Sequence, residues 1–596
     1  MSKDKKIIKY TNRDFSSIKE GLVEYTKRYY PTVYKDFSEA SFGSLMMDSV
    51  SYIGDVLSFY LDYQVNESFL DTAVEYNNIL RMGEQVGYKA PLKGSSFGIA
   101  TFYVLATTQP NAAAPDLNYL PVLSKGSKLI SNSGQVFSLA EDINFANTNN
   151  ETVTATSDAL GSPTSFAVKA YGKVISGELK TTSITVGDFK RFLTLAIDDN
   201  NISEIVSVRD TEGHEYYEVD YLSQDTIFRS VVNKDNKTKD QTPNVVVATS
   251  VPRRFSVFSR AGQTLLKFGY GSESSLKNDN VTHPSNVVLK MHGRDYEKDL
   301  SFDPSKLIES DKFGISPANT VLTVSYRANT SENSNVASRE LTTVSEPLYV
   351  WPSGATENAK IDFVKNSLEC TNESLITGDV SLPTVSELKQ RINDTFSSQN
   401  RAVTAEDYQA IIYRMPAKYG RVKRAKLVRD HDSFKRNLNL YVLSEDLDGK
   451  LATANSVLKN NVKVWINNYK MINDTVDILD PKIINIGINF TAVVNYDQDK
   501  YEALTAGIDA IQEMYEENLD IGQPIYIVDI YNKLNNLEEI VDVVNVEITE
   551  KIGSEYSDES VDLKHYTSAD GRILYAPTDT IYELKFPNTD IKGTIK

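Results

Sequence analysis

Residues 11–87 contain three consecutive stretches of apolar side chains at helical spacing, and they constrain the fold more than any other feature. In the first stretch the apolar residues recur at alternating steps of three and four, as in the seam of a coiled coil. They are Phe15, Ile18, Leu22, Tyr25 and Tyr29. We expect Thr11 and Asp14 to form a capping box that opens this helix, which should end before Pro31.

The second stretch, residues 44–65, is apolar along two stripes. One stripe contains Met46, Val50, Ile53, Leu57 and Tyr60, and the other contains Leu45, Tyr52, Val56, Phe59 and Tyr63. A helix with two apolar stripes has to be covered on two sides. We expect Ile53, Leu57 and Tyr60 to lie beneath the side chains of the first helix in an intersubunit bundle.

The third stretch contains Phe69, Ala73, Tyr76 and Leu80, and Gly87 is placed to end it in the left-handed conformation. Three helices of this kind make only a thin core. We therefore expect other chains to complete the bundle.

Size and charge bound the remaining possibilities. A chain of 596 residues should fold as several domains, because single hydrophobic cores stop growing well below this length. The formal net charge of −18 argues against a general nucleic-acid-binding protein. The single cysteine, Cys370, excludes an internal disulfide and is expected to be a small buried core residue.

The second stretch is also the only candidate for a membrane-spanning segment. It contains Asp48, Asp55 and Asp62, which are seven residues apart and so lie on nearly one face of a helix. Each carboxylate would cost roughly 2.5–3.5 kcal/mol in a bilayer. We therefore expect no membrane insertion, and we expect this acidic row to face solvent or a partner.

Beyond residue 93 the helical periodicity gives way to short alternating strands, and after residue 383 strand pairs alternate with helices. The predicted fold class is multidomain α+β. The expected domains are an N-terminal helical bundle segment at 1–92, a central β-rich domain at 93–140 plus 241–382, an inserted β domain at 141–240, and C-terminal α/β sandwich-like domains at 383–480 and 481–596.

Helix starts in the C-terminal part are marked by two capping boxes. These are Thr384 with Glu387 and Thr404 with Asp407. The helix after Thr404 must end before Pro416. A last strand pair is expected at 573–575 and 581–584.

The sequence contains no recognisable motif for catalysis, metal binding or cofactor binding. The histidines lack the helical spacing of a zinc site, and they are His214, His283, His292, His431 and His565. The glycine turn at 265–271 lacks both phosphate-binding patterns, and residues 446–449 resemble a turn more than a calcium loop. We therefore expect no enzymatic activity, no metal and no cofactor.

A basic cluster stands out between residues 414 and 436, where nine basic and two acidic residues give a local charge of +7. The candidate residues are Arg414, Lys418, Arg421, Lys423, Arg424, Lys426 and Arg429. One interpretation is a solvated strand edge protected from aggregation. The other is a docking site for an acidic partner. A nucleic-acid site is the weakest alternative, because no aromatic stacking pattern interleaves with the cations.

Several short segments carry a family resemblance. They are residues 10–15 (Tyr-Thr-Asn-Arg-Asp-Phe), 29–31 (Tyr-Tyr-Pro), 36–37, 41–43, 52–60, 87–89, 268–271 (Phe-Gly-Tyr-Gly), 314–327 and 399–408. Together they resemble the baseplate J-like family, in particular the baseplate wedge subunits of T-even-type contractile-tail phages. Residues 141–240 match no part of that pattern.

The resemblance implies a structural subunit of the phage tail baseplate, present in the virion and assembled in the host cytoplasm. It implies pairing with a second copy, and an N-terminal helical bundle shared with a longer wedge protein. It also implies contacts with other small wedge proteins and with tail hub or sheath-initiating proteins. Nucleic acid and membrane are not among the implied partners.

Two functions of another kind stay open at this point. A tail-associated glycan hydrolase would need a cleft with two carboxyl groups about 5–9.5 Å apart, one of them with a raised pKa. A receptor-binding β protein of the fibre type would show internal repeats, and we find none at a fixed period.

Overall fold

The computed structural model describes residues 14–32, 34–38, 41–90, 92–109, 114–158, 162–232, 244–260, 262–272, 313–430, 437–494, 499–515, 519–553 and 556–596. The chain divides into two compact units. A helical unit is formed by Met1–Ala90 and Pro383–Ser397, and a second unit by Pro91–Leu382 and Ser398–Lys596.

The helical unit contains helices α1 (Phe15–Tyr29), α2 (Phe42–Asn66), α3 (Tyr76–Gln85) and α8 (Val385–Ser398). The predicted end of the first helix is confirmed, but its predicted start is wrong. The N-cap is Asp14, which accepts a hydrogen bond from the backbone N–H of Ser17 at 3.1 Å. Ser17 Oγ accepts in turn from the N–H of Asp14 at 3.2 Å, so the capping box begins three residues after Thr11. Thr11 itself lies outside the described residues.

The third helix begins later than its apolar spacing predicts. Phe69 lies in a bend and Ala73 in an irregular segment before α3, which starts at Tyr76. Its predicted end is confirmed, since Gly87 has a φ of +93°. The N–H of Tyr88 donates to the carbonyl of Gly83 at 2.9 Å, which closes the helix end in the manner of a Schellman motif.

Helix α8 belongs to the helical unit, although it is distant in sequence. Thr384 Oγ1 accepts from the N–H of Glu387 at 3.3 Å, as the predicted capping box requires. Its side chains at i and i+4, Leu388 and Ile392, are buried against Ile79 and Tyr88. The prediction that residue 383 opens a C-terminal domain is therefore wrong for this helix, because its apolar side is buried by α3.

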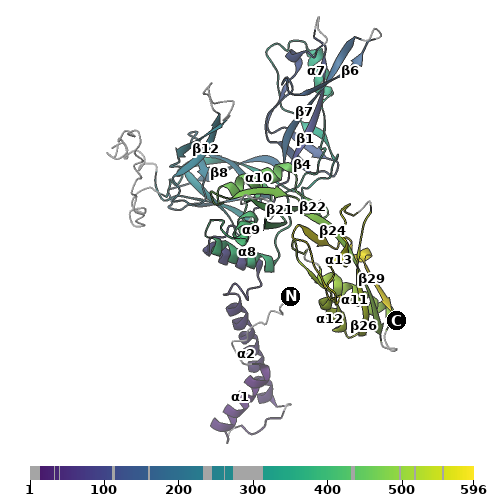
Figure 1. Ribbon diagram of the computed structural model, residues 1–596. Coiled ribbons are helices and arrows are strands. Elements are labelled where there is room, and N and C mark those ends of the chain that lie inside the picture. Colours follow the sequence, from purple (N-terminus) through teal and green to yellow (C-terminus); the bar gives the residue numbers. More distant parts are fainter. Residues whose placement is uncertain are drawn as a thin grey trace. The chain divides into compact units, whose positions relative to one another are not determined.

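In the second unit, a seven-stranded sheet has the order β17-β3-β4-β7-β1-β19, with β6 paired to β7. The bounds are β17 (Leu341–Glu346), β3 (Lys128–Ser131), β4 (Val136–Leu139), β7 (Pro163–Ser176), β1 (Phe97–Thr107), β19 (Glu369–Thr371) and β6 (Glu151–Ser157). The long strands β1 and β7 run side by side in Figure 1, with Phe97 opposite Ile175 and Thr107 opposite Ser165.

A second seven-stranded sheet has the order β8-β16-β10-β11-β14-β15-β9. The bounds are β8 (Glu178–Val186), β16 (Thr320–Ala328), β10 (Ile202–Arg209), β11 (Glu215–Glu218), β14 (Arg254–Arg260), β15 (Gln263–Phe268) and β9 (Thr194–Ile197). Strands from residues 141–240 thus pair in both large sheets with strands from outside that range. The prediction of a separate inserted domain is wrong, because sheet pairing joins it to the central β region.

Smaller elements complete this β region. A three-stranded sheet contains β18 (Tyr349–Val350), β2 (Val122–Leu123) and β5 (Ile143–Asn144), and a hairpin contains β12 (Thr226–Val232) and β13 (Asn244–Ser250). Two helical segments, η1 (Leu117–Tyr119) and α7 (Asn358–Asn366), lie against each other.

The C-terminal part contains two further sheets covered by helices. The first comprises β20 (Arg424–Arg429), β21 (Asn437–Glu445), β22 (Leu451–Thr453) and β23 (Thr475–Leu479), with helices α9 (Ala405–Tyr413), η2 (Ala417–Tyr419) and α10 (Ser456–Asn467). The predicted capping box of α9 is confirmed, since Thr404 Oγ1 accepts from the N–H of Asp407 at 3.2 Å and the Asp407 carboxylate accepts from that of Thr404 at 2.9 Å.

The last sheet comprises β26 (Ile540–Glu550), β24 (Lys482–Val494), β28 (Thr580–Glu583) and β29 (Ile591–Ile595). The remaining elements are α11 (Lys500–Met514), β25 (Ile525–Tyr526), α12 (Ile527–Asn535), α13 (Leu563–Tyr566), β27 (Ile573–Leu574) and α14 (Pro587–Asp590). The predicted last strand pair is wrong, because β27 pairs with β25 and β28 with β24. The fold class, multidomain α+β, is confirmed.

Candidate assembly interface

The large apolar side chains of α2 are exposed in the single chain. Ile53 and Leu57 are each 57 % exposed, and Tyr60 is 62 % exposed. The same holds for Leu45, Met46, Val50, Tyr52, Phe59 and Leu61. We call these nine residues the apolar face of α2. Exposed apolar surface that is continuous along a helix marks an interaction site, since monomeric proteins rarely present large patches of this kind.

Helix α1 packs on the opposite, small and polar face of α2. Ser44 and Ser51 are buried there. A Cβ at Gly54 would lie 3.1 Å from Cδ1 of Ile18, so glycine permits this close approach. Lys19 and Asp48 form an ion pair of 2.7 Å across the two helices. Within one chain Ile53, Leu57 and Tyr60 are therefore not covered by α1. Their place beneath the first helix of an intersubunit bundle stays a prediction.

The five predicted residues of α1 divide into two groups. Ile18 and Leu22 are half-buried, while Phe15, Tyr25 and Tyr29 are exposed. The rings of Tyr25 and Tyr29 lie 4.7 Å apart. Ile18 contacts α2 at Gly54, and the half-buried Leu22 lies one turn further along the same side of α1. The three aromatic residues remain available to a partner.

The acidic row of α2 lies on its better covered side. Asp48, Asp55 and Asp62 are all half-buried, so within one chain this row faces solvent only in part. No helix in the described part of the chain has an apolar stretch of the length needed to cross a bilayer.

Glu67 anchors the start of α3 to the end of α2. Its carboxylate accepts hydrogen bonds from the N–H groups of Val74 at 2.6 Å and Glu75 at 3.2 Å, and from the side chain of Asn78 at 2.9 Å. Burial by itself raises the pKa of Glu67. These hydrogen bonds and the charge of Lys389 together lower it by more, so the pKa of Glu67 lies below its usual value.

This arrangement predicts an acid-sensitive contact. A carboxylate whose pKa is depressed in the folded state stabilises that state above the unfolded pKa, about 4.3, and this contribution is lost as the pH falls through the folded pKa. Opening of the Val74 amide, measured by hydrogen exchange, should therefore increase on acidification below about pH 4.3. In the Glu67→Gln variant, opening of the Val74 amide should be more frequent at neutral pH and should change little on acidification. Equal acid dependence in both proteins would contradict the assignment.

The basic cluster at 414–429 does not form an exposed patch. Only Arg429 of the seven candidates is exposed, and the others bond within the second unit. These bonds join Arg414 to Asn400, Lys418 to Glu218 at 3.2 Å, Arg421 to the carbonyls of Leu92 and Val380, Lys423 to Glu445 at 2.5 Å, Arg424 to Asp520 at 3.0 Å and Lys426 to the carbonyl of Ile521 at 2.7 Å. The predicted acidic-partner dock is therefore corrected, because three of these cations pair with carboxylates of the same chain and three more donate to its neutral oxygen atoms.

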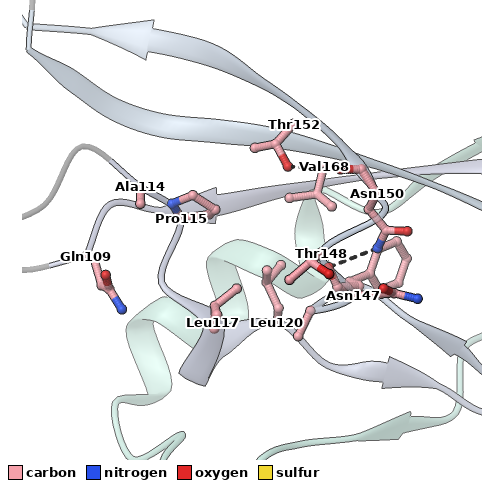
Figure 2. Close-up of a pocket in the computed structure, with 12 residues that line it drawn as sticks. Gln109, Ala114, Pro115, Leu117, Leu120, Asn147, Thr148, Asn150, Thr152 and Val168 are labelled. Carbon is pink, nitrogen blue, oxygen red and sulfur yellow. Dashed lines mark hydrogen bonds between the residues drawn. The ribbon is translucent and has the colours of Figure 1, made fainter.

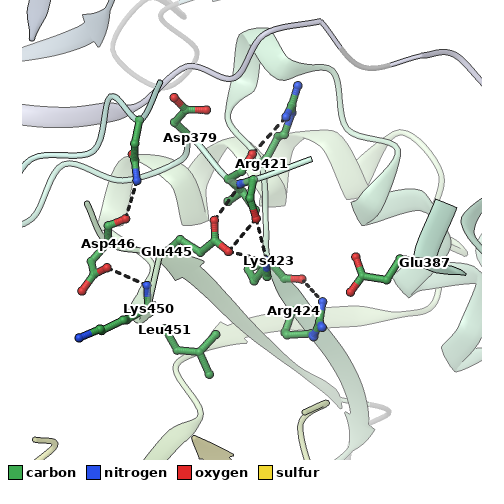
Figure 3. A network of polar contacts seen from close by, with 12 residues as sticks. Asp379, Glu387, Arg421, Lys423, Arg424, Glu445, Asp446, Lys450 and Leu451 are labelled. Atoms are coloured by element: carbon green, nitrogen blue, oxygen red, sulfur yellow. Dashed lines mark hydrogen bonds and ion pairs between the residues drawn. The ribbon is translucent and has the colours of Figure 1, made fainter. Parts of the chain in front are cut away.

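Figure 3 shows the polar contacts that Lys423 and its neighbours in this cluster make within the second unit. Lys423 points toward the buried carboxylate of Glu445 at the end of β21. The same carboxylate accepts from the N–H of Ser381 at 2.8 Å and from its hydroxyl at 3.0 Å. A buried charge needs such a full set of partners, so the network holds strand β21 to the segment around Ser381.

A cavity of about 280 Å³ lies beside β6 and β7 (Figure 2). It is lined by apolar residues such as Leu117, Leu120 and Val168 and by neutral polar ones such as Gln109 and Asn150. None of its described lining residues is ionisable, so these residues offer no general acid or base.

Two carboxyl groups outside this cavity have raised pKa values. Burial raises the pKa of Asp446 and of Glu583. Asp446 accepts from the N–H groups of Asp448 at 3.0 Å and Lys450 at 2.8 Å, as in the predicted turn. Glu583 accepts from the N–H of Leu451 at 2.8 Å. Both groups thus support backbone structure, and the charge of Asp446 also contributes to the raised pKa of Glu583.

Cys370 is buried in the core of the first large sheet, as predicted. Burial raises the pKa of its thiol to about 12, which keeps it protonated and unreactive near neutral pH.

Comparison with known proteins points to the helical segment. Residues 14–85 match the family model for the N-terminal domain of a bacteriophage baseplate protein. The match includes α1, α2 and α3, and thus the whole apolar face of α2. It relates the chain to baseplate structural proteins through this segment. No curated protein matches the sequence.

Two solved structures are similar to the chain at low scores. One is the baseplate of the anti-feeding prophage, with 10 % identity, a TM-score of 0.26, and coverage of 96 % of this chain and 98 % of that chain. The other is the TssK–TssF–TssG baseplate subcomplex of the type VI secretion system, with 8 % identity, a TM-score of 0.25, and coverage of 72 % and 96 %. At these TM-scores neither likeness defines the fold.

Proposed function

We propose that this chain is a structural subunit of a phage tail baseplate wedge. It pairs with a second copy of itself and shares an N-terminal helical bundle with a longer wedge protein. Wedges joined in this way build the ring around the tail tube. The role is architectural and needs neither cofactor nor metal.

The observation that carries the proposal is the uncovered apolar face of α2 within the segment that matches a baseplate domain. Burying one such side chain stabilises a complex by roughly 1.5–3 kcal/mol. Nine exposed apolar residues on one helix therefore represent a large driving force for association.

The spacing of these residues favours helical partners. Leu45, Tyr52 and Phe59 are seven apart, and so are Met46, Ile53 and Tyr60. A seven-residue repeat keeps a stripe facing one neighbouring helix in a left-handed supercoil. Two adjacent stripes accommodate two partner helices, one from a second copy and one from the longer wedge protein.

The remaining partners follow from the same proposal. Other small wedge proteins and tail hub or sheath-initiating proteins contact the β-rich and C-terminal parts. The protein is assembled in the host cytoplasm and resides in the baseplate of the virion tail. Nucleic acid and membrane are not partners.

Self-association tests the pairing of copies. The full chain has a mass of 66.6 kDa, and light scattering behind size-exclusion chromatography should show a concentration-dependent rise toward about twice that mass. Addition of the longer wedge protein should convert the sample to a defined mixed complex. A chain that stays monomeric at every concentration, with or without that partner, would contradict the proposal.

A further inference from the structure

A second unpartnered surface lies in the β-rich unit, on the loop between β8 and β9. The loop has the sequence Asp188-Phe189-Lys190-Arg191-Phe192, and all five residues are exposed. Two adjacent cations, Lys190 and Arg191, lie between two phenylalanines. It is separate in sequence from the apolar face of α2.

The loop forms an ordered cluster with the end of β15. The N–H of Phe192 donates to the carbonyl of Gly269 at 2.8 Å, which fixes the loop against the glycine turn. The Phe192 ring lies 5.6 Å from the ring of Tyr270, and Lys267 Nζ lies 5.6 Å from the Phe192 ring centre. The Arg191 guanidinium lies 4.4 Å from the centre of the Tyr270 ring.

Phe192 is held in an unfavourable backbone conformation. Its φ is +51°, and its side chain is 40 % exposed. Residues with a Cβ have a strained backbone at positive φ, and such strain is concentrated at functional sites. Burial does not explain a phenylalanine here, because much of the ring is presented to solvent.

The cations of the cluster have no ion-pair partner among the described residues, unlike Lys418, Lys423 and Arg424. Lys190, Arg191 and Lys267 form no ion pair with any residue that the structure describes. The adjacent Asp188 carboxylate is exposed and likewise forms none within the described chain. The surface therefore combines three available cations with exposed aromatic rings, on a chain whose net charge is −18.

We propose that this cluster, comprising Phe189, Lys190, Arg191, Phe192, Lys267 and Tyr270, docks an acidic segment of a partner protein. A guanidinium stacked on a tyrosine ring keeps its N–H groups free along its edge, where they pair with a carboxylate in a bidentate manner. The aromatic rings shield these ion pairs from water and contact the aliphatic parts of the segment. A short acidic peptide fits the small extent of the cluster better than a nucleic acid or an anionic membrane. Those larger polyanions would extend beyond the three cations and meet the negative charge of the rest of the chain.

The test uses the full chain and a fluorescein-labelled peptide of eight glutamates, followed by fluorescence anisotropy at low and physiological salt. We expect saturable binding that weakens with salt. The double variant Lys190→Glu, Arg191→Glu should lower the affinity by about tenfold or more. A matched control, Arg429→Glu with Lys463→Glu, changes the total charge equally at two exposed cations elsewhere and should stay within about twofold of the wild type.

A third variant separates the ring from the charge. Phe192→Asn removes the ring and introduces a residue that tolerates positive φ. Thermal stability should therefore be unchanged or higher, while the affinity for the peptide falls. Absence of peptide binding, or equal losses in the test and control variants, would overturn the proposal. So would tighter binding of single-stranded DNA or of phosphatidylglycerol vesicles that depends on the same two cations.

Discussion

Ile53→Asp combined with Leu57→Asp is expected to abolish incorporation of the chain into the helical bundle while leaving its own fold intact. Both side chains are more than half exposed in the single chain, so two carboxylates cost little there. In the bundle they would be buried without partners. The two lost apolar contacts alone amount to about 3–6 kcal/mol, or roughly a hundredfold to ten-thousandfold in affinity.

The measurement is co-purification with the longer wedge protein, together with the mass of the free chain in solution. Val464→Asp is a suitable control, because Val464 is a helix residue of the second unit that is 67 % exposed. It should assemble like the wild type. Leu22 is a poorer choice for this experiment, since it is half-buried and its replacement would also disturb the packing of α1 on α2. Normal assembly of the double variant would show that the apolar face of α2 is not the interface.

Leu388→Ala is expected to destabilise the helical unit selectively. Leu388 is fully buried in the small cluster that joins α8 to α3, and a cavity at such a site costs about 2–5 kcal/mol. That cluster has only five buried members, so the loss should open the unit at least partially. Hydrogen exchange should accelerate at residues 67–90 and in α8, while strands β1, β7 and β24 keep their protection.

A matched change in the second unit gives the opposite pattern. Leu440 is also fully buried, on β21, and Leu440→Ala should accelerate exchange around β20 and β21 without affecting α3. If Leu388→Ala instead weakened the C-terminal sheet first, α8 would belong to that domain as the sequence alone suggested.

Much of the local structure could be predicted because its causes are local. The capping box at Thr404 and Asp407 and the glycine end at Gly87 each depend on residues three or four apart, and both are present. The start of the first helix was missed because both Thr11 and Asp14 are acceptable N-caps, and only the Ser17 hydroxyl completes the second.

Pairing over long distances could not be predicted in this way. Strand β7 lies between β1 and β4, and β28 lies parallel to β24, but nothing in their own residues specifies those neighbours. For this reason the predictions of a separate inserted domain and of a last strand pair were both wrong. The prediction of a docking site at the basic cluster was wrong for a similar reason. Glu445, Asp520 and Glu218, which pair with its cations, come from distant segments of the chain.

By itself the sequence determined that α2 carries more apolar surface than its own chain can cover, because the excess is a matter of side-chain composition and helical periodicity. Only the tertiary structure decided which surface stays open. Gly54 and Ser51 allow α1 to approach closely on the small face, and Lys19 adds an ion pair to Asp48 there. The larger side chains at Ile53, Leu57 and Tyr60 are consequently left facing outward, where another molecule can cover them.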